Sequence, residues 1–104
     1  MDKLILRKGT LPDDILQDLR KVIDILLRLG AMKIILYGSL ARGDYRVDSD
    51  IDLCVEGIPD TNYFRALAEC LMQTKRSISI LDFKNIQGYL RKRILQEGKL
   101  LYER

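Results

Sequence analysis

The segment from Tyr37 to Leu53 constrains the fold of this chain more than any other stretch. An apolar run at residues 34–37 enters it, a second apolar run at residues 51–55 leaves it, and mostly glycine, serine, arginine and aspartate lie between them. Aliphatic and β-branched runs bounded by glycine and aspartate are typical of buried strands. The pattern therefore predicts a strand, a Gly-Ser turn, a short connection and a second strand that begins with Asp50 and Asp52.

The spacing of these two aspartates predicts a cation site. Side chains alternate between the two faces of a strand, so Asp50 and Asp52 project from the same face with their Cα atoms about 6–7 Å apart. Two carboxylates on a half-buried face repel each other and lose hydration, and a divalent cation between them relieves both effects. Mg²⁺ suits such a site because it accepts a few carboxylate oxygens together with substrate phosphates.

At the other end of the segment, Gly38 and Ser39 are suited to holding phosphate. Glycine lets the backbone approach a ligand closely, and the Gly38 N–H and the Ser39 hydroxyl can both donate hydrogen bonds to phosphate oxygens. A phosphate cradle beside a carboxylate pair favours chemistry on a nucleoside triphosphate. Arg42 is a third nucleotide-binding candidate; it either neutralises the phosphates or forms a structural ion pair with Asp44 or Asp48, and we favour the ion pair.

The motif Gly-Ser-x-Ala-Arg-Gly at residues 38–43 is followed after five residues by Ser-Asp-x-Asp-Leu at residues 49–53. This arrangement resembles the signature of the minimal nucleotidyltransferases, which belong to the DNA polymerase beta-like nucleotidyltransferase superfamily. Nine specified residues in a fixed register make the resemblance specific, whereas an Asp-x-Asp pair alone is a weak signal. The resemblance implies the nucleotidyltransferase fold, ATP as substrate, and two Mg²⁺ ions held by Asp50 and Asp52.

The resemblance also implies a third carboxylate, on a strand beside the one that carries the Asp-x-Asp pair. Asp82 is the only acid in the strand expected at residues 77–83, and it lies among apolar residues, where an acid usually has a function. We therefore expect Asp82 to be the third catalytic carboxylate and metal ligand, or to accept the proton of the attacking hydroxyl. The alternative is that Asp82 caps the end of its strand.

Composition excludes several other classes of protein. The chain is 104 residues long, 47% hydrophobic and 32% charged, which is typical of one folded domain that spans residues 1–104. No apolar run could cross a membrane and no signal-peptide pattern is present, so we expect a cytoplasmic protein without a membrane partner. The absence of histidine excludes His-based triads and zinc sites. Cys54 and Cys70 lie among apolar residues and are expected to be reduced core thiols.

The remaining elements predict an α+β domain, a small mixed β-sheet flanked by helices. Residues 4–6 are expected to form a short strand or a packed arm. Helices are expected between a Thr10 cap and Gly30, over residues 64–72, and over residues 86–94 with Gly98 closing the last helix. Strands are expected at residues 33–37, 50–55, 77–83 and 99–102. Ser49 is expected to cap the turn before its strand rather than to contact substrate.

The acceptor of the nucleotide follows only from the resemblance. Stand-alone minimal nucleotidyltransferases resemble the antitoxins of two-gene pairs whose partner is a helical HEPN ribonuclease, and such antitoxins transfer AMP from ATP to a tyrosine of the toxin. The resemblance therefore implies a protein adenylyltransferase that silences a partner toxin. Two features are compatible with docking: the apolar stripe of the first helix, which Leu16, Ile23 and Leu27 widen beyond the needs of one sheet face, and the basic residues among 84–104. Core packing explains the stripe equally well.

Two alternatives stay open. In the first, the chain keeps the fold without catalysis and neutralises its partner sterically; in the second, it is a nucleotidyltransferase subunit that modifies RNA or a small molecule. The second alternative is disfavoured, and direct nucleic-acid binding is not expected, because the chain has no basic stripe interleaved with aromatic residues. The basic run at residues 91–93 is interpreted as a solvated helix face.

Overall fold

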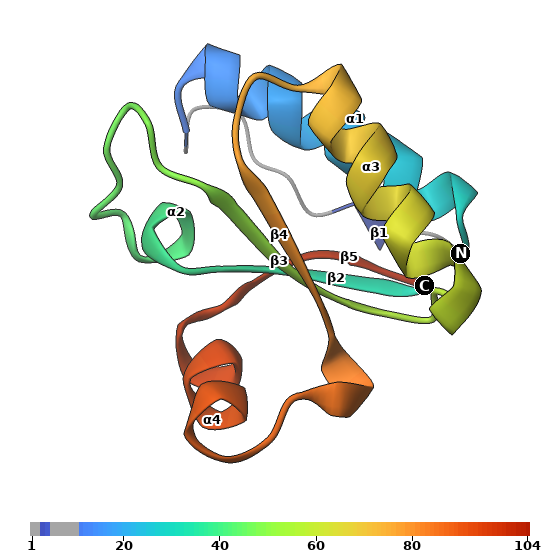
Figure 1. Cartoon of the computed structure of the whole chain (residues 1–104). Helices are drawn as coiled ribbons and strands as arrows, with labels where there is room; N and C mark the ends of the chain where they lie inside the picture. The colour runs from blue at the N-terminus through green and yellow to red at the C-terminus, as the bar shows by residue number, and fades with distance from the viewer. Residues whose placement is uncertain (1–2, 5–10) are drawn as a thin grey trace.

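The computed structural model describes residues 3–4 and 11–104 (Figure 1). The strands are β1 (Lys3–Leu4), β2 (Lys33–Tyr37), β3 (Ile51–Glu56), β4 (Ile78–Asp82) and β5 (Lys99–Glu103). The helices are α1 (Asp13–Arg28), α2 (Ser39–Arg42), α3 (Tyr63–Gln73) and α4 (Gly88–Glu97), with short 3-10 turns η1 (Asp60–Asn62) and η2 (Phe83–Asn85). Residues 5–6 of the expected first strand and the expected Thr10 cap lie outside the described residues.

The described strands form one mixed sheet in the order β1-β5-β2-β3-β4. The β3–β4 pair is parallel, and the β1–β5, β5–β2 and β2–β3 pairs are antiparallel. This architecture confirms the predicted α+β fold, a mixed sheet flanked by helices. The strands expected at 33–37, 50–55, 77–83 and 99–102 all form, each within one residue of its expected ends.

The two faces of the sheet carry two separate cores, because alternate residues of each strand point to opposite faces. The helices α1 and α3 cover one face, where Leu53 and Val55 are fully buried, and α4 covers the other face, where Cys54 is buried (Figure 1). Both cysteines are free and buried, as predicted. Burial raises the pKa of the Cys54 and Cys70 thiols to about 11, so neither thiol ionises near neutral pH.

The helix α1 uses its wide apolar stripe for core packing. Leu16 and Ile23, which widen the stripe, are 5% and 3% exposed, so core packing accounts for most of the apolar excess. The helix ends at Arg28, and Gly30 follows its C-cap residue Leu29 with a φ of +110°, which favours glycine. The Gly30 and Ala31 N–H groups donate to carbonyls of the last helical turn at 3.2 and 3.0 Å, which is a Schellman cap. Among the described residues, no helix combines the length and apolar character required to cross a membrane.

The Gly-Ser turn is more ordered than the sequence predicted. Residues 39–42 form the single helical turn α2, in which the Ala41 and Arg42 N–H groups donate to the Gly38 carbonyl at 3.1 and 3.0 Å. Leu40 and Ala41 are buried and anchor this turn to the larger core. A helix of one turn is too short for its periodicity to be visible in the sequence, which explains why only a turn was expected.

Candidate active site

The register of β2 and β3 brings the two ends of the motif together. Tyr37, the last residue of β2, is the antiparallel partner of Asp52 in β3, so Gly38 follows directly beside that carboxylate. Gly38 has φ +74° and ψ −159°, and a Cβ atom at this position would clash with Asp52 Oδ2. Glycine is therefore required here both by the backbone conformation and by the close approach of the carboxylate.

The two aspartates differ in their surroundings. Asp50 is exposed immediately before β3, whereas Asp52 is partly buried within the strand. Burial raises the pKa of the Asp52 carboxyl above its ordinary value, the neighbouring Asp50 charge raises the pKa further, and Arg42 opposes both. A desolvated carboxylate beside a second one is a site where a bound cation relieves unfavourable charge. The donor set therefore fits Mg²⁺, with only two carboxylates contributed by the chain.

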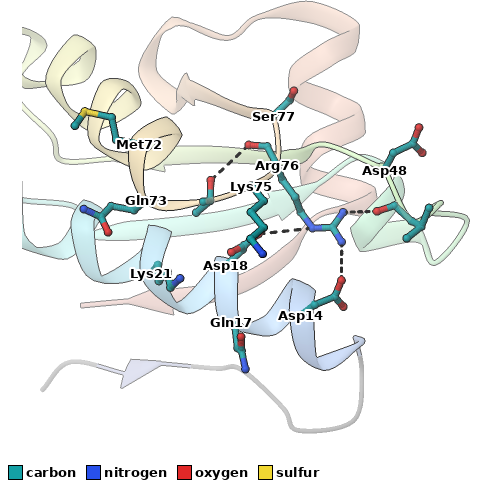
Figure 2. Close-up of a pocket in the computed structure, with 12 residues that line it drawn as sticks. Asp14, Gln17, Asp18, Lys21, Asp48, Met72, Gln73, Lys75, Arg76 and Ser77 are labelled. Carbon is teal, nitrogen blue, oxygen red and sulfur yellow. Dashed lines mark hydrogen bonds and ion pairs between the residues drawn. The ribbon is translucent and has the colours of Figure 1, made fainter.

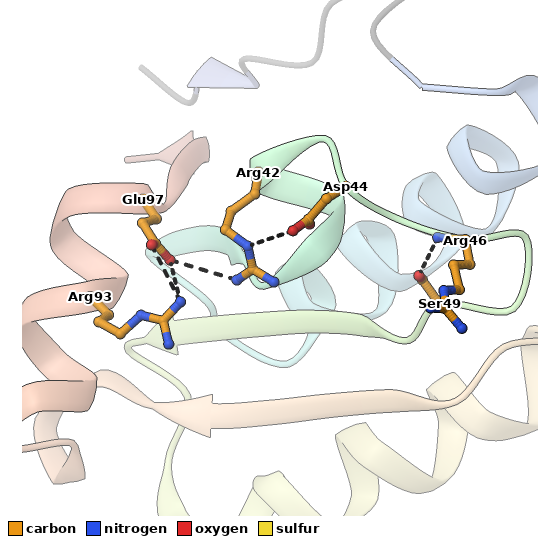
Figure 3. A network of polar contacts seen from close by, with 6 residues as sticks. All are labelled: Arg42, Asp44, Arg46, Ser49, Arg93 and Glu97. Carbon is orange, nitrogen blue, oxygen red and sulfur yellow. Dashed lines mark hydrogen bonds and ion pairs between the residues drawn. The ribbon is translucent and has the colours of Figure 1, made fainter.

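Arg42 forms the ion pair that the sequence favoured, and its partner is Asp44. The Arg42 Nε atom lies 3.4 Å from Asp44 Oδ2, and Arg42 Nη1 lies 3.6 Å from Glu97 Oε2 in α4 (Figure 3). Arg42 also lowers the pKa of Asp52, so its charge acts on the carboxylate pair. Glu97 was not a candidate from the sequence, because nothing local indicates that α4 packs beside the Gly-Ser turn.

Ser49 closes the turn before β3, as predicted. The Arg46 N–H donates to Ser49 Oγ at 2.7 Å, and the Ser49 N–H donates back to the Arg46 carbonyl at 3.0 Å (Figure 3). Ser39 is the first residue of α2 and is partly exposed beside Gly38. The structure therefore places Gly38 against Asp52 and Arg42 close enough to affect the pKa of that carboxyl, while Ser39 follows Gly38 in the chain.

The structure does not bring Asp82 to the other two carboxylates. In the parallel β3–β4 register Asp82 is the partner of Val55, three residues beyond Asp52, and alternation places its side chain on the opposite face of the sheet. Its carboxylate accepts a hydrogen bond from the Lys84 N–H at 3.1 Å and pairs with Lys84 Nζ at 3.6 Å. Among the described residues no group of three acids or cysteines can hold a metal. These contacts with Lys84 agree with the alternative prediction, in which Asp82 caps the end of its strand.

A serine, and not the expected third carboxylate Asp82, lies beside Asp52 in β4. The residue of β4 in register with Asp52 is Ser79, which therefore shares the Asp52 face. A hydrogen bond joins Ser79 to the hydroxyl of Tyr37, the partner of Asp52 on the other side. Burial raises the pKa of the Tyr37 hydroxyl, and the hydrogen bond with Ser79 opposes this rise. Asp52 thus lies in a row between two hydroxyl groups, which the sequence did not reveal because the register was unknown.

Comparison with known proteins relates this site to a family. The sequence profile described as "Polymerase beta, Nucleotidyltransferase" matches residues 20–104. MJ0604 of Methanocaldococcus jannaschii, provisionally named a protein adenylyltransferase, is 38% identical over 78 residues, which cover 67% of this chain and 77% of that protein. MJ0435 of the same organism bears the same provisional description and is 33% identical over 82 residues, with 76% and 88% covered.

Solved structures share the fold. A structure provisionally described as a minimal nucleotidyltransferase superposes with a TM-score of 0.67 at 26% identity and covers 88% of this chain and 98% of that chain. A chain of a toxin–antitoxin structure with AMP-PNP superposes with a TM-score of 0.71 at 20% identity, and the match covers 82% of this chain and 73% of that chain. A chain from the Shewanella oneidensis complex of a tri-AMPylated HEPN toxin with an MNT antitoxin superposes with a TM-score of 0.67 at 17% identity. The match covers 86% of this chain and 72% of that chain. The profile match, the curated relatives and the shared fold agree, and the chain belongs to the polymerase beta nucleotidyltransferase family.

Proposed function

We propose that this chain is a Mg²⁺-dependent nucleotidyltransferase that transfers AMP from ATP to a tyrosine hydroxyl of a HEPN-type toxin, and that it acts as the antitoxin of that protein. The observation that carries this proposal is the close approach of Gly38 to Asp52, which sets a phosphate-binding bend against a carboxylate pair. A protein acceptor is supported by the curated relatives, which are provisionally named protein adenylyltransferases. A toxin acceptor is supported by the shared fold with a chain of the AMPylated toxin–antitoxin complex. We also propose that the chain acts in the cytoplasm, because its proposed substrate, ATP, is available there.

In the proposed reaction the tyrosine oxygen attacks the α-phosphorus of ATP. A phosphorus–oxygen bond to the tyrosine forms while the bond from the α-phosphorus to the bridging oxygen breaks, pyrophosphate leaves, and the hydroxyl proton passes to water. The Gly38 N–H and the Ser39 hydroxyl would donate to phosphate oxygens, and Arg42 would offset their charge. Asp50 and Asp52 would hold Mg²⁺, which supplies charge neutralisation at the phosphates when bound.

The test is transfer of label from ATP labelled at the α-phosphate to the protein encoded beside this chain. We expect labelled partner only with Mg²⁺, and we expect Asp50→Asn and Asp52→Asn each to reduce labelling at least about 100-fold, because each removes a metal ligand. Asp48→Asn is the matched control, since it removes an exposed acid from the connection that leads into β3. The Asp48→Asn chain should label the partner as the wild-type chain does. Mass spectrometry of the labelled partner identifies the acceptor residue.

A second candidate function is steric neutralisation of the partner without AMP transfer. One observation favours it: Ser79, and not the expected third carboxylate Asp82, lies beside Asp52, so the described residues contribute two carboxylates to the site. If the partner gains no label, while the wild-type chain and Asp52→Asn neutralise it equally well, the enzymatic proposal is wrong and the steric one holds. Label on RNA and not on protein would instead support the RNA-modifying alternative.

A further inference from the structure

A small cavity adjoins the candidate active site on the α4 side of the sheet. Its volume is about 140 Å³, and it lies between the end of β2, the turn α2 and the helix α4. Two of the residues that line it, Tyr37 and Gly38, also border Asp52. A water occupies about 30 Å³ in the liquid, so this volume has room for a few waters or a small polar group.

Three charged side chains line this cavity, and they contact one another. Glu97 lies between two guanidinium groups, with its Oε2 atom 3.6 Å from Arg42 Nη1 and 3.1 Å from Arg93 Nη2 (Figure 3). The side chains of Arg42, Glu97 and Arg93 are 35%, 35% and 43% exposed. Ion pairs at this level of exposure are weak and can exchange partners.

The sequence suggested that the basic run at residues 91–93 is a solvated helix face, and the structure shows that only part of it is. The Arg91 guanidinium stacks over the Phe83 ring at 4.3 Å, and Arg93 reaches Glu97 and the cavity, whereas Lys92 is exposed. Of these three basic residues, Arg93 alone lines the cavity beside the candidate active site.

A carboxylate held by two guanidinium groups occupies the position that a phosphate would take, because arginine binds carboxylate and phosphate with the same planar set of donors. We propose that Arg42 and Arg93 form a subsite for the polyphosphate tail of a nucleoside triphosphate, and that Glu97 fills this subsite until the tail displaces it. This inference rests on the proposed function, and it adds Arg93 as a ligand-binding residue and Glu97 as an internal competitor.

The proposal predicts opposite effects of two substitutions in α4. Glu97→Gln frees both guanidinium groups and removes a charge that repels phosphate, so tripolyphosphate should bind about three- to tenfold more tightly. Arg93→Gln removes one of the two cations, so tripolyphosphate should bind about three- to tenfold more weakly. Arg93→Lys should fall between wild type and Arg93→Gln, because a lysine keeps the charge and loses the planar set of donors.

Isothermal titration of the full chain with tripolyphosphate, with and without Mg²⁺, measures these effects without any dependence on activity. Glu103→Gln is the matched control, because it removes one negative charge from an exposed residue of β5 that pairs with Lys33 and does not line the cavity. Melting curves establish that each variant is folded. The proposal is overturned if Glu97→Gln and Glu103→Gln change the affinity equally, or if Arg93→Gln binds like wild type.

The label-transfer assay, run in parallel, separates this inference from the proposed function. If the wild-type chain labels its partner and the three α4 variants bind tripolyphosphate like wild type, the subsite is wrong and the function stands. If the affinities change as predicted and no partner is labelled, the subsite stands and the proposed transfer reaction is wrong.

Discussion

At the scale of single residues, Asp52 carries a conflict between function and stability. Its carboxylate is partly buried beside Gly38 and close to Asp50, and both burial and the neighbouring charge raise its pKa. Because the pKa is higher in the folded chain than in the unfolded chain, the folded state binds the proton more readily between those two values. Ionisation of Asp52 therefore lowers the stability of the fold as the pH rises through this interval.

We therefore expect Asp52→Asn to raise the melting temperature at pH 7 in the absence of divalent metal. The gain should shrink as the pH is lowered toward about 4, where an ordinary aspartate also becomes protonated. Added Mg²⁺ should raise the melting temperature of the wild-type chain and have little effect on Asp52→Asn, because the variant lacks a ligand. Thermal unfolding from pH 4 to 8, with EDTA or Mg²⁺, measures both effects. A lower melting temperature of Asp52→Asn at pH 7 would contradict this account.

At the scale of elements, one arginine joins the connection before β3 to two other parts of the fold. Arg76 lies just before β4, and its Nη1 atom donates to the carbonyls of Val47 and Ser49 at 2.7 and 3.2 Å. Its guanidinium also lies 3.1 Å from Asp14 and 3.9 Å from Asp18, both in α1 (Figure 2). The Arg76 side chain is only 10% exposed. It thus ties down the backbone immediately before Asp50.

We expect Arg76→Met to lower the free energy of unfolding by about 2–4 kcal/mol. The substitution leaves two carbonyls without a donor and the poorly exposed Asp18 carboxylate without its counter-ion. Arg28→Met is the control, because it breaks an exposed pair with Asp24 in the same helix α1 and should cost less than about 0.5 kcal/mol. Urea unfolding measures both values, and equal losses would show that the Arg76 contacts contribute nothing specific.

At the scale of the whole molecule, the last strand lies inside the sheet. The strand β5 pairs with β1 on one side and with β2 on the other, although it is last in the chain. Its residues Leu101 and Tyr102 are 4% and 3% exposed and belong to the larger core. The strand that leads to Gly38 therefore depends on residues at the far end of the chain for its position.

Removal of residues 99–104 should abolish cooperative folding. It takes two buried side chains from the core, each worth about 1.5–3 kcal/mol, and it leaves one edge of β2 unpaired. Lys99→Ala, an exposed position of the same strand, should change stability by less than about 0.5 kcal/mol. Circular dichroism and thermal unfolding test both variants; a sharp unfolding transition in the shortened chain would show that β5 is dispensable.

The strands and most of the helices could be predicted because their signals are local. The runs at residues 33–37 and 51–55 alternate between two cores, and the Gly-Ser and Asp-x-Asp motifs lie at the ends of those runs, so their proximity followed from a simple hairpin. The prediction for Asp82 placed it on the correct neighbouring strand and did not bring it to the pair, because a strand pattern contains no information about register. A shift of three residues both moves a side chain along the strand and turns it to the other face.

The amino-acid sequence alone determined which residues could bind phosphate and metal. It also determined the succession of strands and helices along the chain, because side-chain chemistry and periodicity are properties of neighbouring residues. Long-range packing decided that Ser79 and not Asp82 lies beside Asp52, and that Glu97 of α4 pairs with Arg42. These contacts depend on how β4 and α4 dock on the sheet, and docking is set by the burial of two cores whose members come from the whole chain.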